Sequence, residues 1–116
     1  MEMTVEHDGD VSVVVLKVPT LDAVNHCEFM AAIAPLLGGN SKVVLDISEL
    51  KFVDSSGLGA ILSAVRRINA AGGEMKLLCQ AHKPVRMFFD LVRIYEVIDI
   101  CNTRQEAVEA LTGAAL

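Results

Sequence analysis

Short apolar runs alternate along this chain with segments whose apolar residues recur every three or four positions, and this alternation constrains the fold most. The runs at 11–18, 42–47 and 75–79 are mostly apolar, as strands buried on both faces are. Segments with helical periodicity separate these runs, and the periodicity is clearest from Leu58 to Ile68. The pattern predicts an α/β fold in which helices cover a mixed, mostly parallel sheet and right-handed crossovers join the strands.

The first half of the chain is expected to hold two strands, a helix and a third strand at 42–47. The opening strands at 2–6 and 11–18 flank an Asp-Gly step, which is a hairpin signal. A helix follows from about Asp22, its predicted N-cap, and is expected to end near Pro35, whose ring clashes with the preceding turn. Apolar residues at helical spacing mark its expected buried face: Val24, Cys27, Ala31 and Ala34.

The second half continues the alternation with three helices and two strands. The expected bounds are a helix from about 56 to 72, a strand at 75–79, a helix at 84–92, a strand at 97–100 and a helix from 103. Pro84 suits a first helical turn, and a capping box joins Thr103 to Glu106. The 84–92 helix is expected to bury Val85, Phe88, Phe89 and Val92 and to expose Met87 and Leu91. The predicted order is therefore ββαβαβαβα.

Composition excludes several classes of protein. The 116 residues fit one domain, with a core expected at about 2–112. The net charge of -5 and the lack of a basic run argue against nucleic acid. No segment reaches the ~18 apolar residues of a membrane helix, and the acidic N-terminus lacks the apolar stretch of a signal peptide. The three cysteines are far apart and suit a reducing compartment, so we expect a soluble cytoplasmic protein.

One segment, FVDSSGLG at 52–59, combines polar residues and glycines where a loop enters a helix. In open α/β sheets, ligands and partners meet the loops at the carboxyl ends of the strands. A phosphate on Ser55 or Ser56 would face unpaired N–H groups and the positive end of the helix dipole, and the two glycines would let another backbone approach. Local chemistry alone favours a structural interpretation, in which Asp54 and both serines cap the helix.

Other chemical motifs find little support. The glycines at 57 and 59 lack the third glycine and the later acidic residue of a dinucleotide fingerprint, and there is no Gly-Lys-Ser/Thr phosphate loop. No Cys/His spacing suits zinc. Asp22, Asp46 and Asp54 would have to gather in space to hold a metal, so we expect no metal or other cofactor. A hydrolase using Ser55 or Ser56 remains an alternative whose base would come from afar.

The string LDISELKFVDSSGLGAIL at 45–62, followed by GGEMKLLC at 72–79, resembles the STAS-domain family, specifically the bacterial anti-sigma factor antagonists. PVRMFFDL at 84–91 and QEAVEAL at 105–111 match the register of that family. The resemblance covers essentially the whole chain. It implies a single STAS domain over 1–116 that is not an enzyme.

The resemblance also implies a partner-switching cycle. In that family the serine after the aspartate, here Ser55, is phosphorylated by an anti-sigma factor that is itself a serine kinase. The unmodified antagonist binds this kinase and frees the sigma factor, whereas the phosphorylated form lets go and a metal-dependent phosphatase restores it. ATP and metal belong to those partners. The partner-binding residues that the resemblance implies are Asp22, Asp54, Ser56, Gly57 and Leu58.

The chain departs from the family pattern at two places. Pro19 stands where relatives usually have a glycine, three residues before Asp22, and its fixed φ is expected to alter the loop and partner choice. Arg93 and Ile94 stand where relatives often have a small residue or glycine. An alternative role with the same fold is a non-phosphorylated accessory subunit of a signalling scaffold or a lipid-transport complex.

Overall fold

The computed structural model describes residues 1–113. Its main sheet has five strands in the spatial order β1-β2-β4-β6-β7. These strands are β1 (Met3–Asp8), β2 (Val11–Leu16), β4 (Lys42–Asp46), β6 (Glu74–Leu78) and β7 (Ile100–Cys101). β1 pairs antiparallel with β2, and the other neighbours are parallel. The predicted mixed, mostly parallel sheet is therefore confirmed.

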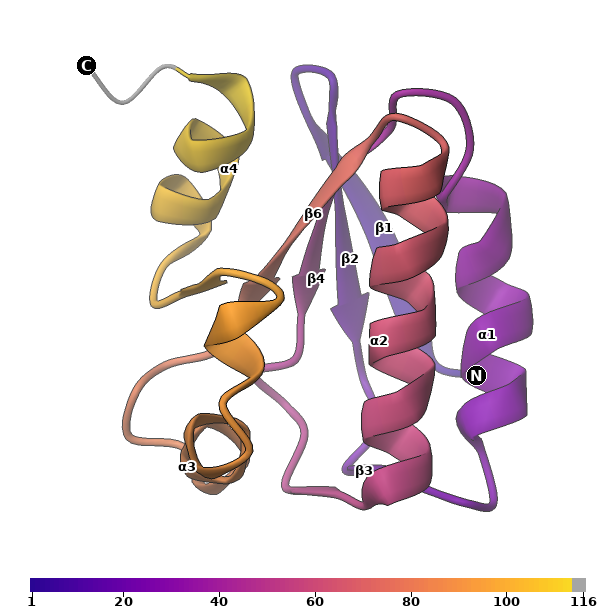
Figure 1. Cartoon of the computed structure of the whole chain (residues 1–116), viewed down its shortest axis with the longest axis vertical. Coiled ribbons are helices and arrows are strands. Elements are labelled where there is room, and N and C mark those ends of the chain that lie inside the picture. The colour runs from indigo at the N-terminus through magenta and orange to yellow at the C-terminus, as the bar shows by residue number, and fades with distance from the viewer. Residues whose placement is uncertain (114–116) are drawn as a thin grey trace.

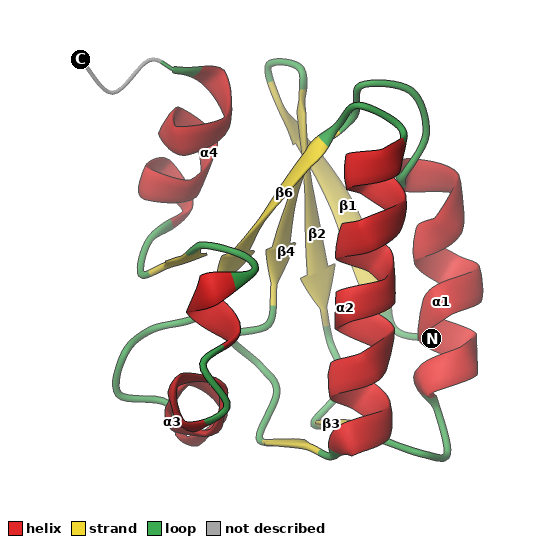
Figure 2. Ribbon diagram, in the orientation of Figure 1, coloured by secondary structure: helices red, strands yellow, loops and turns green. Residues whose placement is uncertain are grey.

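Helices cover both faces of this sheet, as Figures 1 and 2 show. They are α1 (His26–Ile33), α2 (Ser55–Ala70), α3 (Pro84–Leu91) and α4 (Arg104–Thr112). α1 and α2 lie side by side on one face, and α4 packs on the other. Alternate residues of β2 enter different cores: Val14 and Leu16 face α1 and α2, whereas Val11 and Val13 face α4. The larger core lies under α1 and α2, where each fully buried aliphatic side chain contributes roughly 1.5–3 kcal/mol.

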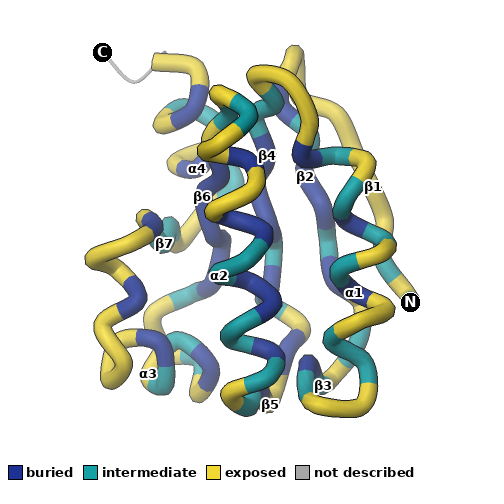
Figure 3. Tube along the Cα trace, turned by 45° about the vertical axis from the view of Figure 1, so that its right-hand side comes forward, coloured by how far each residue is buried: buried dark blue, intermediate teal, exposed yellow. Residues whose placement is uncertain are grey.

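Four short elements were not predicted. β3 (Thr20–Leu21) and β5 (Phe52–Val53) form a separate two-stranded parallel sheet, and η1 (Ala34–Leu36) and η2 (Ile94–Glu96) are 3₁₀ turns. Two-residue strands are too short to show a hydrophobic period, so the sequence pattern does not reveal them. In Figure 3 the β3–β5 pair lies at the end of the molecule where α2 begins.

The predicted start and buried face of the first helix are wrong. α1 has Asn25, not Asp22, as its N-cap, and it ends at Ile33, just before Pro35. Phe29 and Ile33 form its buried face, because these large apolar side chains pack in the larger core. Val24, which precedes the helix, is 93% exposed. Cys27 and Ala31 are exposed as well.

The strand predicted at 97–100 is present, but its bounds are wrong: β7 holds only Ile100–Cys101, and the 3₁₀ turn η2 (Ile94–Glu96) lies before it. The backbone reverses at Arg93, whose φ of 60° lies in the left-handed region. That conformation explains why a glycine suits this position. The capping box is confirmed in part: Glu106 N–H donates to Thr103 Oγ1 at 3.1 Å, but the Glu106 carboxylate accepts from Asn102 N–H at 2.8 Å rather than from Thr103.

The third helix agrees with the prediction except at its end. Val85 and Phe89 are buried, Phe88 is half-buried, and Met87 and Leu91 are exposed as expected. Val92, which was expected to be buried, is exposed. Across residues 1–113, none of the helices combines the length and the apolar character that a bilayer span requires.

Candidate functional site

The β3–β5 pair brings two distant loops together at the start of α2. Thr20 pairs with Phe52 and Leu21 with Val53. Just before this pair, the Pro19 carbonyl accepts hydrogen bonds from Lys51 N–H at 2.7 Å and Phe52 N–H at 3.2 Å. The contact uses the carbonyl of Pro19, so the missing N–H of proline costs nothing here. As a result, the loop after β3 lies against the first turn of α2.

Asp54 joins these two segments through its carboxylate. It is the N-cap of α2, and its Oδ1 accepts from Gly57 N–H at 2.9 Å. Its Oδ2 accepts from Ala23 N–H at 3.1 Å, in the loop after β3. The hydrogen bond from Gly57, supported by the one from Ala23, outweighs desolvation and lowers the pKa of Asp54 below its ordinary value. Asp54 is therefore a carboxylate at neutral pH.

Asp22 shapes the same loop from the other side. Its Oδ1 accepts from Val24 N–H at 3.0 Å and Asn25 N–H at 3.3 Å. The Asn25 side chain completes the turn: it accepts from Asp22 N–H at 2.9 Å and donates to the Thr20 carbonyl at 2.8 Å. Asp22 and Asp54 thus lie in one hydrogen-bonded loop cluster, so the structure brings these two predicted partner-binding residues together.

At Gly57, α2 lies in close contact with the backbone of β3. A Cβ at this position would lie 2.2 Å from the Leu21 carbonyl oxygen, so only glycine fits. The room predicted at the two glycines for another backbone is therefore filled at Gly57 by this chain's own strand. At Gly59, a Cβ would meet nothing within 4 Å among the described residues. Gly57 itself is buried, and its role at the site is to let the helix begin there.

Ser55 is the first residue of α2 and is exposed to solvent. Ser56 and Leu58 are half-buried beside it, and Leu58 packs on the larger core. Two exposed apolar side chains flank this turn: Val24 is 93% exposed and Phe52 is 55% exposed. Neither was among the site residues predicted from the sequence. The prediction that Val24 lies on a helix face was wrong, although its position between Asp22 and Asn25, two residue types that favour turns, was a signal that it could lie in a loop.

The alternative chemistries receive no support from this geometry. Within residues 1–113, no three His, Cys, Asp or Glu side chains lie close enough to hold a metal ion. Asp46 instead accepts a hydrogen bond from Ser48 N–H at 2.9 Å. His26 lies near Asp54, but its ring nitrogens contact Cys27 Sγ at 3.7 and 3.9 Å. In the described part of the chain neither Ser55 nor Ser56 is hydrogen-bonded to a base that would activate it.

Comparison with known proteins identifies relatives of this chain. Over 69 residues it is 36% identical to an anti-sigma F factor antagonist of Paenibacillus polymyxa. The matched stretch is 60% of this chain and only 58% of that relative's length. A crystal structure from Thermotoga maritima, of a candidate anti-sigma factor antagonist, superposes with a TM-score of 0.77 and 26% identity, covering 95% of this chain and 94% of the other.

A third similarity concerns the fold alone. The Bacillus cell fate determinant SpoIIAA in its phosphorylated form has a TM-score of 0.65 at 23% identity, covering 94% of this chain and 98% of that one. The sequence model of the STAS domain matches residues 2–107, which is nearly the whole described chain. The resemblance found in the sequence is thus confirmed, and the chain belongs to the STAS domain family.

Proposed function

We propose that this chain is an anti-sigma factor antagonist that is switched off by phosphorylation of Ser55. The observation that carries the proposal is an exposed serine on the first turn of a helix whose start is held by Asp54. In the unmodified state the chain binds a serine-kinase anti-sigma factor in the cytoplasm and frees the sigma factor. The kinase then phosphorylates Ser55, and a metal-dependent phosphatase restores the hydroxyl. The chain itself catalyses no step.

The position of Ser55 explains how the fold tolerates the phosphate. The first N–H groups of a helix have no carbonyl of an earlier turn to donate to, and the helix dipole places positive potential there. The carboxylate of Asp54 already satisfies the N–H of Gly57 and reaches away to Ala23. A phosphate on Ser55 therefore adds charge to a turn that is already held in place.

The same phosphate opposes a bound partner. It adds about -1.5 to -2 charges at neutral pH beside the ionised Asp54. Inside a close protein contact, this charge creates like-charge repulsion and a desolvation cost. Each ~1.4 kcal/mol lowers the affinity tenfold, so a few kcal/mol are enough to release the partner.

Partner contact is expected to spread from Ser55 over its exposed neighbours. Val24 and Phe52 are apolar, solvent-exposed and placed on the two segments that the β3–β5 pair holds together. Asp22 and Asp54 fix the loop that carries Val24, and Gly57 lets α2 begin against it. Ser56 and Leu58 complete the surface as half-buried residues of the first turn.

The test of the modified residue is direct. Incubation with the serine-kinase anti-sigma factor that copurifies with the tagged chain, together with ATP, is expected to add one phosphate, located on Ser55 by peptide mass spectrometry. Ser55→Ala abolishes the modification, whereas the matched variant Ser56→Ala keeps it. Equal phosphorylation of Ser55→Ala contradicts the assignment, and copurification of transporter or scaffold subunits in place of a kinase supports the accessory-subunit alternative.

The switch itself is tested by binding. The unmodified chain and the chain phosphorylated in vitro are titrated against the same anti-sigma factor by calorimetry. We expect at least a tenfold lower affinity after phosphorylation, and the same direction for Ser55→Asp. Unchanged affinity would leave Ser55 modified but not regulatory.

A further inference from the structure

Helix α3 carries a second apolar stripe beside its buried face. Val85 and Phe89 pack in the larger core. A neighbouring side of the helix holds apolar residues at positions i, i+3, i+4 and i+7, which we call the α3 stripe: Pro84, Met87, Phe88 and Leu91. Met87 is 65% exposed and Leu91 is 81% exposed, although the outward side of a surface helix is normally polar. The α3 stripe is therefore an apolar surface that this chain does not cover.

The α3 stripe continues into a groove that leads toward Ser55. This β5–α3 groove has a volume of about 260 Å³. Pro84 and Phe88 line one wall, and Phe52 lines the other. Figure 3 shows α3 and β5 together at the end of the molecule where α2 begins. Because Phe52 already belongs to the surface proposed around Ser55, the two apolar areas form one continuous surface.

Two lysines without a carboxylate partner border the β5–α3 groove. Lys51 lines it, and Lys51 and Lys83 together line an adjoining pocket of about 430 Å³. Within residues 1–113 neither lysine forms an ion pair, whereas the other lysines are all paired: Lys17, Lys42 and Lys76. Glu49, the carboxylate that lines the adjoining pocket, lies 4.0 Å from Lys17 Nζ. The rim of the groove is therefore positive, on a chain whose net charge is -5.

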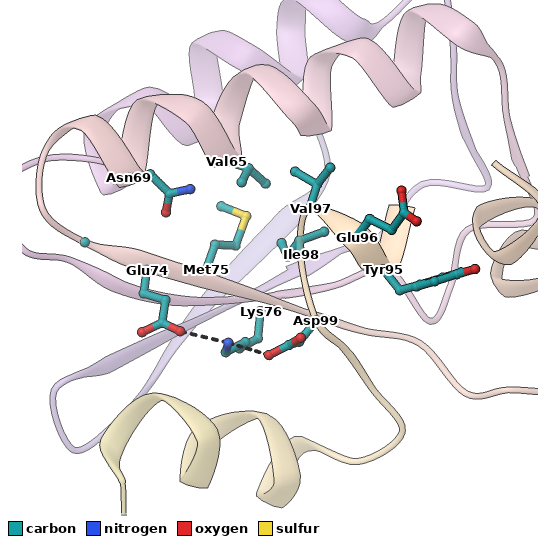
Figure 4. A pocket seen from close by; sticks show the side chains of 11 residues that line it. Val65, Asn69, Glu74, Met75, Lys76, Tyr95, Glu96, Val97, Ile98 and Asp99 are labelled. Carbon is teal, nitrogen blue, oxygen red and sulfur yellow. Dashed lines mark hydrogen bonds and ion pairs between the residues drawn. The ribbon is translucent and has the colours of Figure 1, made fainter. Parts of the chain in front are cut away.

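A groove of about 410 Å³ beside η2 shows the opposite balance of charge. In Figure 4 the ammonium of Lys76 lies between two carboxylates, those of Glu74 at 2.8 Å and Asp99 at 2.7 Å. Glu96, which also lines this groove, pairs with Arg93 at 3.0 Å. Each charged side chain in that lining thus has a partner within the chain. A charged ligand would have to compete with these pairs, whereas Lys51 and Lys83 are available.

We propose that the α3 stripe and the β5–α3 groove bind an amphipathic helix of the anti-sigma factor, with acidic side chains beside Lys51 and Lys83. An apolar stripe at helical spacing packs against a matching stripe of another helix. Exposed apolar patches with a polar rim mark such contacts in soluble proteins. Acidic side chains on the bound helix supply the charge that the two lysines lack. The identity of the partner rests on the proposed function, but the chemistry of the bound helix does not.

The first experiment needs no anti-sigma factor. A fluorescent helical peptide with leucine at every third or fourth position and glutamates on its polar side is titrated against the full chain, with fluorescence anisotropy as the readout. The double variant Lys51→Glu, Lys83→Glu is expected to weaken binding at least tenfold. The matched reversal Arg66→Glu, Arg67→Glu changes two exposed cations of α2 that also form no ion pair in the described chain, and is expected to leave the affinity unchanged.

A second peptide, in which lysines replace the glutamates, is expected to bind the wild-type chain at least tenfold more weakly. Equal binding of the two peptides, or equal weakening by the two double variants, would show that the lysines of the groove do not select the ligand and would overturn the proposal.

The second experiment separates this inference from the proposed function. Leu91→Ser changes a side chain that is 81% exposed, so the fold is expected to persist, as a thermal melt would check. Its affinity for the anti-sigma factor is expected to fall about tenfold. Val5→Ser is the matched control: Val5 is 40% exposed on β1, at the opposite edge of the sheet, and its substitution is expected to leave the affinity unchanged.

The outcomes are distinct. If the wild-type chain binds the factor and Leu91→Ser binds it equally well, the inference is wrong and the proposed function stands. If the wild-type chain does not bind the factor, the proposed function fails, and the peptide experiment alone decides whether the α3 stripe takes an acidic helix. Self-association in analytical ultracentrifugation that Leu91→Ser abolishes would assign the stripe to a second copy of this chain and overturn the proposal.

Discussion

Helices α2 and α4 both begin with a side-chain N-cap, and they differ in what else each cap holds. Asp54 accepts from Gly57 N–H at 2.9 Å, and Thr103 accepts from Glu106 N–H at 3.1 Å. At α4 the second bond, from Asn102 to Glu106, stays within the same turn. At α2 the second bond reaches Ala23, 31 residues away in the sequence.

The position three residues into each helix shows the same contrast. In α4 it holds Glu106, an exposed side chain that contributes to the capping box. In α2 it holds Gly57, whose missing side chain lets the helix touch the Leu21 carbonyl. The α4 cap is therefore local structure, whereas the α2 cap assembles two segments around Ser55. The predictions below test this difference.

The largest effect is expected for Gly57→Ala. The new Cβ would lie 2.2 Å from the Leu21 carbonyl oxygen, so helix and strand must move apart. We expect the free energy of unfolding to fall by about 1–3 kcal/mol, as for other overpacked sites, measured by urea denaturation. Gly59→Ala is the matched control in the same helix: it has open space and is expected to gain roughly 0.5–1 kcal/mol. Equal effects of the two substitutions would contradict the close contact at Gly57.

The next effect is expected for Asp54→Ala, which removes the helix cap and the bond to Ala23 together. Hydrogen exchange at the amides of Ala23 and Gly57 is expected to accelerate, with a larger loss of thermal stability than for removal of the α4 cap. Asp54→Asn separates the two bonds, because the amide retains one accepting oxygen for Gly57 and presents an NH₂ group toward Ala23. In that variant only Ala23 is expected to lose protection. If the Ala23 amide exchanges at the wild-type rate in both variants, the hydrogen bond from Ala23 to Asp54 does not stabilise the loop.

Removal of the α4 cap should have a smaller and purely local effect. Thr103→Ala is expected to lower the free energy of unfolding by ~1 kcal/mol, the usual loss for an N-cap side chain. Amides near Asn102 and Glu106 should exchange faster, and those at Ser55 and Ala23 should not change. A change of binding to the anti-sigma factor in this variant would show that the two caps are coupled after all.

The smallest effect concerns pH. The pKa of Asp54 in the folded chain lies below its ordinary value. As the pH falls, the Asp54 carboxylate is therefore protonated in the unfolded chain before it is protonated in the folded chain. The stabilisation is complete above the ordinary carboxyl pKa and is lost as the pH falls through the folded value. Wild-type stability is therefore expected to exceed that of Asp54→Asn at neutral pH, with the gap closing in acid. A gap that is constant with pH would show that ionisation of Asp54 does not stabilise the fold.

Several features could be predicted because their causes are local. The Thr103 cap, the periodic face of α2 and the exposed Met87 and Leu91 follow from neighbouring residues in one element. The Asp-Ser-Ser-Gly string indicated the start of α2 and the family together. The start of α1 was misplaced because Asp22 looks like an N-cap, although its carboxylate turns the loop by accepting from Val24 and Asn25.

The order of the main-sheet strands and the four α-helices, the caps of α2 and α4 and the exposed serine candidate were therefore determined by the sequence itself, since propensity and periodicity act over a few residues. Only the tertiary structure decided that Gly57 must be a glycine and that Asp54 binds Ala23. Each of these depends on a backbone group that arrives from a distant part of the chain. Main-chain N–H and C=O groups are the same in every residue except proline, so a contact between two of them cannot be predicted from the local sequence pattern.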